Sequence, residues 1–188
     1  MNHSDKIAAD KTSLGFEFQD LVYIEKLIEL RPGQTLGLEL HDDIHVETIA
    51  EDSSIKDLLL IQVKHSVNLG NITERDIDLW KTLHNWLKLV PSLQPYRTIT
   101  FQLYTNKNIN NQPFVNLLKS PRQNIQAILD YIRKIEKEIS LTESQKKTGD
   151  TPNPLAKYVE SVSQTNDTEL MFVLERFEFY SDNSSVMT

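Results

Sequence analysis

Residues 58–64 read Leu-Leu-Leu-Ile-Gln-Val-Lys, and this stretch decides the fold class. Its four leading apolar residues lie between a polar turn at 51–54 and the polar pair His65-Ser66. A short apolar run between such polar segments is typical of a strand buried in the centre of a sheet. The stretch therefore predicts a central strand that carries Gln62 and Lys64 near its end.

The other elements follow from apolar periodicity and turn residues on either side of this strand. In chain order we expect a helix over 13–30, strands over 36–40, 44–50 and 58–64, a helix over 73–90, a strand over 98–104, helices over 114–139 and 154–164, and a strand over 170–179. The order α-β-β-β-α-β-α-α-β predicts an α/β protein with a mixed sheet flanked by helices, rather than a doubly wound fold. No Gly-rich loop follows any expected strand, which excludes Rossmann and Walker nucleotide sites.

The 188 residues suit one domain, which we place at 13–180. We expect a polar segment over 1–12, a flexible insert over 142–153 and a disordered tail over 181–188. The chain has no cysteine, which excludes disulfides and Cys-ligated metal sites. The N-terminus lacks the apolar core of a secretory signal, and no apolar run is long enough to cross a membrane. We therefore expect a cytoplasmic protein without a membrane anchor.

Charge is distributed unevenly along the chain. The net charge is −7, but residues 71–150 carry 12 basic and 8 acidic side chains, and the stretch 81–129 has no acidic residue at all. Such a stretch either faces the phosphates of a nucleic acid or forms a solvated basic face. Its basic residues are Lys81, Lys88, Arg97, Lys107, Lys119 and Arg122.

A polar group is expected where the second and third strands meet. With the turn centred between Ser53 and Ser54, Asp43 lies opposite Lys64, and Glu47 lies opposite Leu60. Because side chains alternate along a strand, Gln62 and Lys64 share a face, which Asp43 joins at the open end of the hairpin. A lysine in a largely apolar strand is costly unless an anion or a reaction needs it. The alternatives are a lysine leaving the sheet at the strand end and a simple cross-strand ion pair.

This arrangement resembles the restriction-endonuclease-like superfamily, PD-(D/E)xK, in which an Asp at the start of a hairpin precedes an (E/D/Q)xK strand. It looks most like the double-stranded-DNA endonuclease domains of bacterial anti-phage effectors, including CD-NTase-associated nucleases and those paired with HerA-type ATPases. The matching segments are Gly15-Phe16-Glu17-Phe18-Gln19, Glu39-Leu40-His41-Asp42-Asp43-Ile44, Gln62-Val63-Lys64-His65-Ser66 and Leu79-Trp80-Lys81-Thr82-Leu83.

The resemblance implies a restriction-endonuclease-like core α-β-β-β-α-β with extra C-terminal helices and a strand. It implies that Asp43 is a metal ligand, that Gln62 holds the middle ligand position with the Val63 carbonyl beside it, that Lys64 lies near the scissile phosphate, and that Glu17 is the acid of the first helix. It implies Mg²⁺ or Mn²⁺ as the metal and double-stranded DNA as the substrate. The acid-free stretch would then supply the DNA-contacting residues, for which we expect Lys81, Lys88, Lys107, Lys119 and Arg122. It further implies a sensor domain or an ATPase partner, a homo-oligomer, and a chain that is the N-terminal piece of a longer protein.

Two of these residues have competing interpretations. Glu17 extends the helical stripe of Leu21, Ile24 and Ile28 toward the sheet, yet it also suits a first-turn carboxylate that meets the helix dipole. Gln62 is neutral where the superfamily often has a carboxylate, which weakens metal affinity or moves ligand duty to the other groups.

Other candidates are weaker as functional residues. We interpret His41, His45 and His65 as polar residues at strand edges, because their spacing matches no ligand pattern. Trp80, Leu83 and Leu87 form a helical stripe that predicts core packing.

The sequence therefore favours a metal-dependent DNA endonuclease. One alternative is an inactive module that uses the same fold to bind DNA or to assemble with a partner. The other is an RNA-directed nuclease, because hydrolysis of an RNA backbone uses the same groups.

Overall fold

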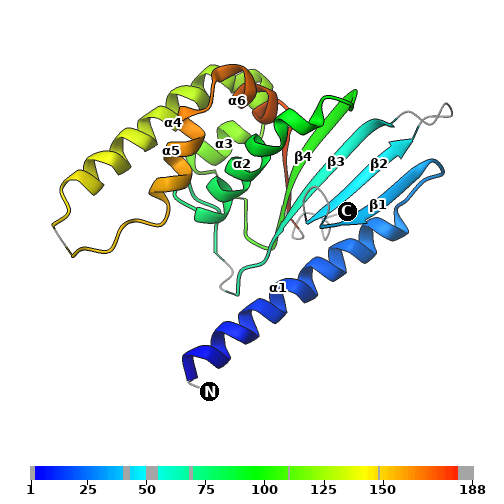
Figure 1. Cartoon of the computed structure of the whole chain (residues 1–188), viewed down its shortest axis with the longest axis horizontal. Helices are drawn as coiled ribbons and strands as arrows, with labels where there is room; N and C mark the ends of the chain where they lie inside the picture. Colours follow the sequence, from blue (N-terminus) through cyan, green and yellow to red (C-terminus); the bar gives the residue numbers. More distant parts are fainter. Residues whose placement is uncertain are drawn as a thin grey trace. The chain divides into compact units, whose positions relative to one another are not determined.

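The computed structural model describes residues 3–39, 43–49, 55–67, 70–109, 111–147 and 149–181 (Figure 1). The elements in chain order are α1 (His3–Ile28), β1 (Gln34–Leu38), β2 (Ile44–Ile49), β3 (Ile55–Lys64), α2 (Ile77–Leu89), the 3-10 helix η1 (Val90–Leu93), β4 (Thr98–Thr105), α3 (Pro113–Leu118), α4 (Pro121–Ser144), α5 (Ala156–Gln164), α6 (Asp167–Leu174) and β5 (Phe177–Ser181). The predicted order α-β-β-β-α-β is confirmed as far as β4.

The strands form one five-stranded sheet in the order β1-β2-β3-β4-β5, with β1 to β4 side by side in Figure 1. β2 is antiparallel to β1 and to β3, whereas β3 and β4 are parallel. A parallel pair needs a crossover connection, and α2 and η1 lie in the chain between β3 and β4. The predicted mixed α/β class is confirmed, and β3 is a central strand, as its apolar run indicates.

The described residues pack as two compact units. The first contains the residues up to Asn71, Gln94–Ile109 and the chain from Glu178 onward, which together hold α1 and most of the sheet. The second contains Ile72–Leu93 and Asn110–Phe177, which hold α2, η1 and α3 to α6.

In the first unit, α1 packs on the sheet through a different face from the one predicted. Val22 is buried in a core with Ile44, Ile61, Val63 and Tyr104, and Phe18 and Tyr23 pack against it. Leu21, Ile24 and Ile28, which the stripe placed against the sheet, are 65, 51 and 80% exposed. The predicted stripe is therefore wrong, because aromatic Phe18 and β-branched Val22 fill the space over the strands.

A charged group extends this packing face of α1. The Lys26 ammonium donates to Glu29 Oε2 at 2.8 Å and to Glu25 Oε1 at 3.2 Å, and it lies 5.2 Å from the centre of the Tyr180 ring. Burial lowers the pKa of Lys26, but the hydrogen bond to Glu29 and the charge of Glu25 outweigh it and raise the pKa above 10.5. Tyr104 donates its hydroxyl to Glu25 at 2.8 Å, which connects this group to β4.

In the second unit, the core prediction for α2 is confirmed. Trp80, Leu83 and Leu87 are buried, and so is Trp86. Trp80 stacks on Phe114 of α3 with ring centres 5.5 Å apart. The helix begins at Ile77 rather than at the expected residue 73, because the Asp76 side chain accepts the N–H of Asp78 and caps the helix.

Three other element boundaries differ from the predictions. α1 begins at His3 rather than near 13, and the expected helix over 114–139 is two helices, α3 and α4. The segment predicted as a strand over 170–179 is instead α6 followed by β5. Asn166 caps α6 by accepting the N–H of Glu169, and Asp167 lies in the first turn, where a carboxylate favours a helix.

α4 also runs to Ser144, into the predicted insert over 142–153, whose flexibility stays a prediction. Of the predicted tail over 181–188, Ser181 belongs to β5 and the rest lies outside the described residues. Within the described part of the chain, no helix is long and apolar enough to cross a membrane.

Candidate functional site

The hairpin of β2 and β3 sets the position of the candidate residues. His45 lies opposite Leu60, and Glu47 lies opposite Leu58 rather than Leu60. The predicted register is therefore wrong by two residues over Ile44–Thr48, and an irregularity between Thr48 and Ile49 shifts the pairing by one more residue. Over Ile44–Thr48 a shift of two keeps the side chains on their predicted face, since the side chains of a strand alternate with a period of two.

Asp43 lies directly before β2 and reaches across to β3. Its Oδ2 accepts the backbone N–H of Val63 at 2.8 Å. Val63 is the middle residue of Gln62-Val63-Lys64, so the carboxylate lies beside the three residues that the sequence singled out. Asp43 and this segment are thus brought together, although not through the predicted pairing of Asp43 with Lys64.

The Val63 carbonyl lies on the same side of β3 as this carboxylate. In a strand, the N–H and C=O of one residue point in the same direction, and those of the next residue point in the opposite direction. Since the Val63 N–H meets Asp43, its carbonyl oxygen also points toward the β2 side. Hard oxygen donors from Asp43 and Val63 are of the kind that Mg²⁺ and Mn²⁺ prefer.

Gln62 and Lys64 share the face of β3 that is turned away from α1. Ile61 and Val63 pack toward Val22 of α1, and the alternation of side chains places Gln62 and Lys64 on the other face. Gln62 is 3% exposed, whereas Lys64 is half-buried. A buried amide and a partly exposed ammonium therefore follow one another on this face, with Asp43 at its edge.

The helix residue that approaches Asp43 is Gln19, which sequence reasoning quoted only as part of a motif. Gln19 Nε2 donates to the backbone oxygen of Asp43 at 3.4 Å. Glu17 is exposed, and its carboxylate accepts the hydroxyl of Ser13 at 3.2 Å. Positions two apart on a helix lie about 200° apart, so Glu17 and Gln19 occupy nearly opposite faces of α1. The ligand role of Glu17 stays a prediction.

A second residue that the sequence did not single out joins the ends of β3 and β4. The side-chain amide of Asn106 accepts the Ser66 N–H and donates to the Ser66 carbonyl, both at 2.8 Å. This pair of bonds has the pattern of a strand ladder, so it ties the segment after Lys64 to the end of β4. Its only sequence signal is that Asn106 opens an Asn-rich loop.

Two of the three histidines near the hairpin have packing roles. The His65 ring lies 5.2 Å from that of Phe18 on α1. His45 is buried, and its ring takes the space of a side chain at Gly37, where a Cβ atom would lie 2.0 Å from His45 Cε1. His41 lies outside the described residues. The described residues contain no group of three or more His, Asp or Glu that could hold a metal ion.

The predicted DNA-contacting residues belong to both units. Lys107 lies after β4 in the first unit, and the others lie in the second. Lys119 donates to Asn111 Oδ1 at 3.0 Å, and Arg122 donates to the Glu175 carbonyl at 3.0 Å. Lys81 and Lys88 are exposed on α2. The basic stretch is thus divided into residues held by local hydrogen bonds and residues that extend into solvent.

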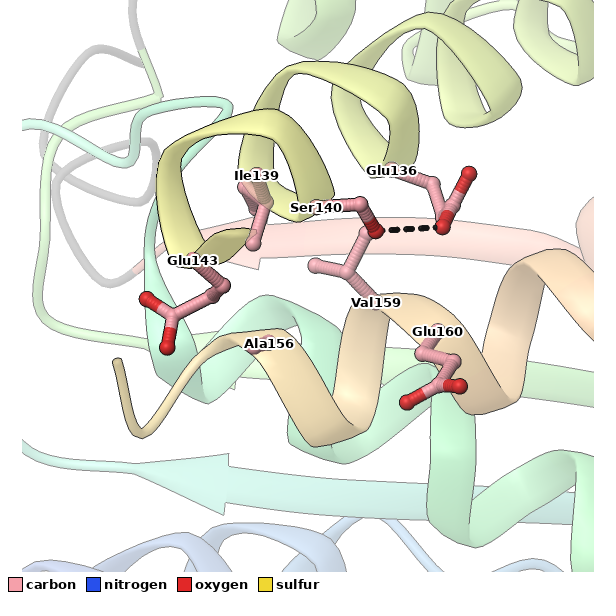
Figure 2. A pocket seen from close by; sticks show the side chains of 7 residues that line it. All are labelled: Glu136, Ile139, Ser140, Glu143, Ala156, Val159 and Glu160. Carbon is pink, nitrogen blue, oxygen red and sulfur yellow. Dashed lines mark hydrogen bonds between the residues drawn. The ribbon is translucent and has the colours of Figure 1, made fainter. Parts of the chain in front are cut away.

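The second unit also contains a pocket of about 190 Å³ between α4 and α5 (Figure 2). Ile139, Ala156 and Val159 give it apolar walls, and Glu136, Glu143 and Glu160 surround them. Glu136 accepts the Ser140 hydroxyl at 2.7 Å, and Lys146 forms an ion pair with Glu143 at 2.6 Å. Glu160 accepts the side-chain amide of Gln164 at 3.1 Å, so each of these carboxylates has a partner within the second unit.

Comparison of this chain with family models, with curated proteins and with solved structures finds no match.

Proposed function

We propose that this protein is a metal-dependent DNA endonuclease domain in which Asp43, Gln62, Val63 and Lys64 form the active site. The observation that supports this most is the 2.8 Å hydrogen bond from Val63 N to Asp43 Oδ2. It connects a carboxylate at the start of a hairpin to the middle of a Gln-x-Lys strand end. The element order α-β-β-β-α-β is consistent with a restriction-endonuclease-like core, which belongs to the same proposal.

The residues present fit a hard divalent cation. The Asp43 carboxylate is a hard oxygen ligand, and the Val63 carbonyl points toward the same side of β3. These two groups would hold Mg²⁺ or Mn²⁺, with the Gln62 amide oxygen as a further donor. The bound cation would polarise the phosphoryl group and lower the pKa of a water molecule.

Each protein group then has a defined task in phosphodiester hydrolysis. The Val63 N–H fixes the orientation of the Asp43 carboxylate, and Gln19 holds the Asp43 backbone at 3.4 Å. Lys64 supplies a positive charge for the negative charge that develops on the phosphate in the transition state. Its half-buried position makes this interaction stronger than it would be in bulk water. We place antiviral defence and assembly with a sensor domain or an ATPase in the same proposal, because they follow from the resemblance.

Plasmid digestion with and without Mg²⁺ tests the proposal. We expect supercoiled DNA to be nicked or linearised only with the metal, and the Lys64→Ala variant to cut about 100-fold more slowly, since loss of a positioned electrostatic donor typically costs that much. Lys137→Ala, which removes an exposed lysine from α4, serves as the matched control and should cut at the parental rate. Equal cutting of RNA and DNA, or equal rates for the two variants, would contradict the proposal.

An inactive module of the same fold is the second candidate, and the burial of Gln62 favours it. A neutral amide at 3% exposure suits a strand that no longer binds a cation. Titration with Mn²⁺ separates the two candidates, because the nuclease binds the ion through Asp43 and the inactive module does not.

A further inference from the structure

Two helices of the second unit bring basic side chains together. α2 contributes Lys81, His84 and Lys88, and α5 contributes Lys157. The two helices pack on one another. We call these four residues the α2–α5 basic cluster.

The centre of the cluster is fixed by contacts of His84. Its Nδ1 lies 2.8 Å from Ser161 Oγ, and its ring packs edge-on against Tyr158 with centres 5.4 Å apart. The Lys157 ammonium lies 4.7 Å from the centre of the same Tyr158 ring. Ser161 and Tyr158 both belong to α5, so they hold the imidazole and the ammonium on one surface of the helix pair.

The three residues from α2 form a single stripe. Positions 81, 84 and 88 are three and four residues apart, so their side chains neighbour one another on the helix surface. Lys81 and Lys88 are exposed and His84 is half-buried. Burial first, and then the charges of Lys88 and Lys157, lower the pKa of His84 below 6.5.

The cations of this cluster are not neutralised by neighbouring carboxylates. Among the residues that the structure describes, Lys81, Lys88 and Lys157 form no ion pair, whereas Lys134 pairs with Glu138 and Lys146 pairs with Glu143. Glu160 of α5 is the nearest acid along that helix, and it lines the pocket shared with α4. Asp78 precedes Lys81 by three residues on α2, and Glu160 follows Lys157 by three residues on α5, so the three lysines outnumber the neighbouring carboxylates. This excess of positive charge would attract an anion.

We propose that the α2–α5 basic cluster binds the phosphodiester backbone of double-stranded DNA. The inference rests on the proposed function and adds His84 and Lys157 to the DNA-contacting residues. Lys81 and Lys88 are seven positions apart on α2, which corresponds to an axial rise of about 10 Å. That distance corresponds to about three base-pair steps of duplex, at 3.4 Å each along one strand. The elongated cluster thus suits several phosphates of a polymer better than one small anion.

The experiment measures the affinity of a fluorescent 20-base-pair duplex at pH 8 in EDTA, over a range of salt concentrations. The test variant is Lys81→Ala/Lys88→Ala/Lys157→Ala. The matched control is Lys134→Ala/Lys137→Ala/Lys147→Ala, which removes the same charge from three exposed lysines of the second unit. The logarithm of the binding constant falls linearly with the logarithm of the salt concentration, and each phosphate contact adds about 0.9 to the steepness of that line. Loss of three contacts should therefore make the line for the test variant less steep by about 2.7. The control should keep most of the parental slope.

His84 provides a second readout on the intact protein. Bound phosphates offset the charges of Lys88 and Lys157, so addition of the duplex should raise the pKa of His84, followed by the NMR signal of its ring. An unchanged His84 pKa with saturating duplex, an unchanged slope in the test variant, or an equal loss in the control variant would overturn the proposal. Tighter binding of duplex RNA through the same lysines would overturn the assignment to DNA. Cleavage does not enter these measurements, so a protein that binds DNA here but never cuts it would refute the proposed nuclease and leave this inference standing.

Discussion

Asp43 and Val63 are joined across the open end of the β2–β3 hairpin, where the Asp43 carboxylate accepts the Val63 N–H at 2.8 Å. This hydrogen bond has two structural effects. It closes the hairpin beyond the last pair of the ladder, Ile44 with Ile61, and it orients a carboxylate toward the end of β3. A structural role and a catalytic role of Asp43 can therefore be separated by choosing what replaces it.

Asp43→Asn should abolish metal-dependent cleavage and leave the fold intact. The amide oxygen of asparagine can still accept the Val63 N–H, but the ligand charge is lost. Asp43→Ala should also abolish cleavage, and in addition it should destabilise the protein by about 1.5–3 kcal/mol, the usual contribution of a hydrogen bond to a charged group. Plasmid nicking and thermal melting on the same preparations measure both effects. Parental cleavage by Asp43→Asn would exclude Asp43 as a ligand.

The packing face of α1 gives a test of the fold itself. Val22→Ala should lower the free energy of unfolding by about 2 kcal/mol, because it removes two methyl groups from a core site that is 1% exposed. Leu21→Ala should change it by less than about 0.5 kcal/mol, since the Leu21 side chain is mostly in solvent. Urea titration of both variants gives the two values. A larger loss for Leu21→Ala than for Val22→Ala would show that the helix uses the other face.

Strong local signals carried most of the fold prediction. The apolar run of β3 predicted a buried strand, and the stripe of Trp80, Leu83 and Leu87 predicted a helix face in the core. Both predictions are confirmed. The stripe on α1 misled because apolar residues occur on more than one side of this helix, so periodicity alone does not choose the buried face. Apolar residues 170–174 also fit a strand and a helix equally well until the cap at Asn166 is considered.

The sequence predicted that Asp43 lies near Gln62 and Lys64, but not the contacts that hold these residues together. Because side chains alternate along a strand, Gln62 and Lys64 lie on one face whatever the register. The two-residue error in the register therefore did not change which side chains share a face with them. The bonds from Asp43 to Val63 and from Asn106 to Ser66 depend on how strand ends meet in space. No spacing in the sequence indicates such contacts between a side chain and a distant backbone group.

Acid should destabilise the protein partly through His84. Its pKa in the folded protein lies below the ordinary 6.5, so on acidification the unfolded chain takes up the proton first. Stability from this group is therefore complete above pH 6.5 and is lost as the pH falls through the lowered pKa of the folded state. His84→Gln should show a smaller drop in melting temperature between pH 7 and pH 5 than the parent protein. An equal or larger drop in the variant would contradict the role of His84.

Gln62→Glu offers the sharpest test of a metal site on this face of the sheet. Because the resembled superfamily often has a carboxylate at this position, we expect the variant to keep its activity or to bind the metal more tightly. The burial of Gln62 adds a condition, because a carboxylate at a position that is 3% exposed is poorly solvated unless a cation accompanies it. Without metal, Gln62→Glu should therefore melt earlier than the parent at pH 8. Mg²⁺ or Mn²⁺ should restore much of the loss, since a ligand that binds only the folded state stabilises it.

Gln102→Glu is the matched control for this variant. Gln102, in β4, is also buried. It pairs with Ile61 of β3, whose side chain packs toward Val22 of α1, so Gln102 lies on the face of the sheet turned toward α1. A carboxylate there should destabilise the protein equally with and without metal, because Asp43 and the Val63 carbonyl are not its neighbours on that face. Melting temperatures of both variants over a Mn²⁺ series, with EDTA as the zero point, make the comparison. If metal rescues both variants alike, or rescues neither, the carboxylate at position 62 does not meet a cation held by Asp43, and the ligand role proposed for Gln62 is wrong.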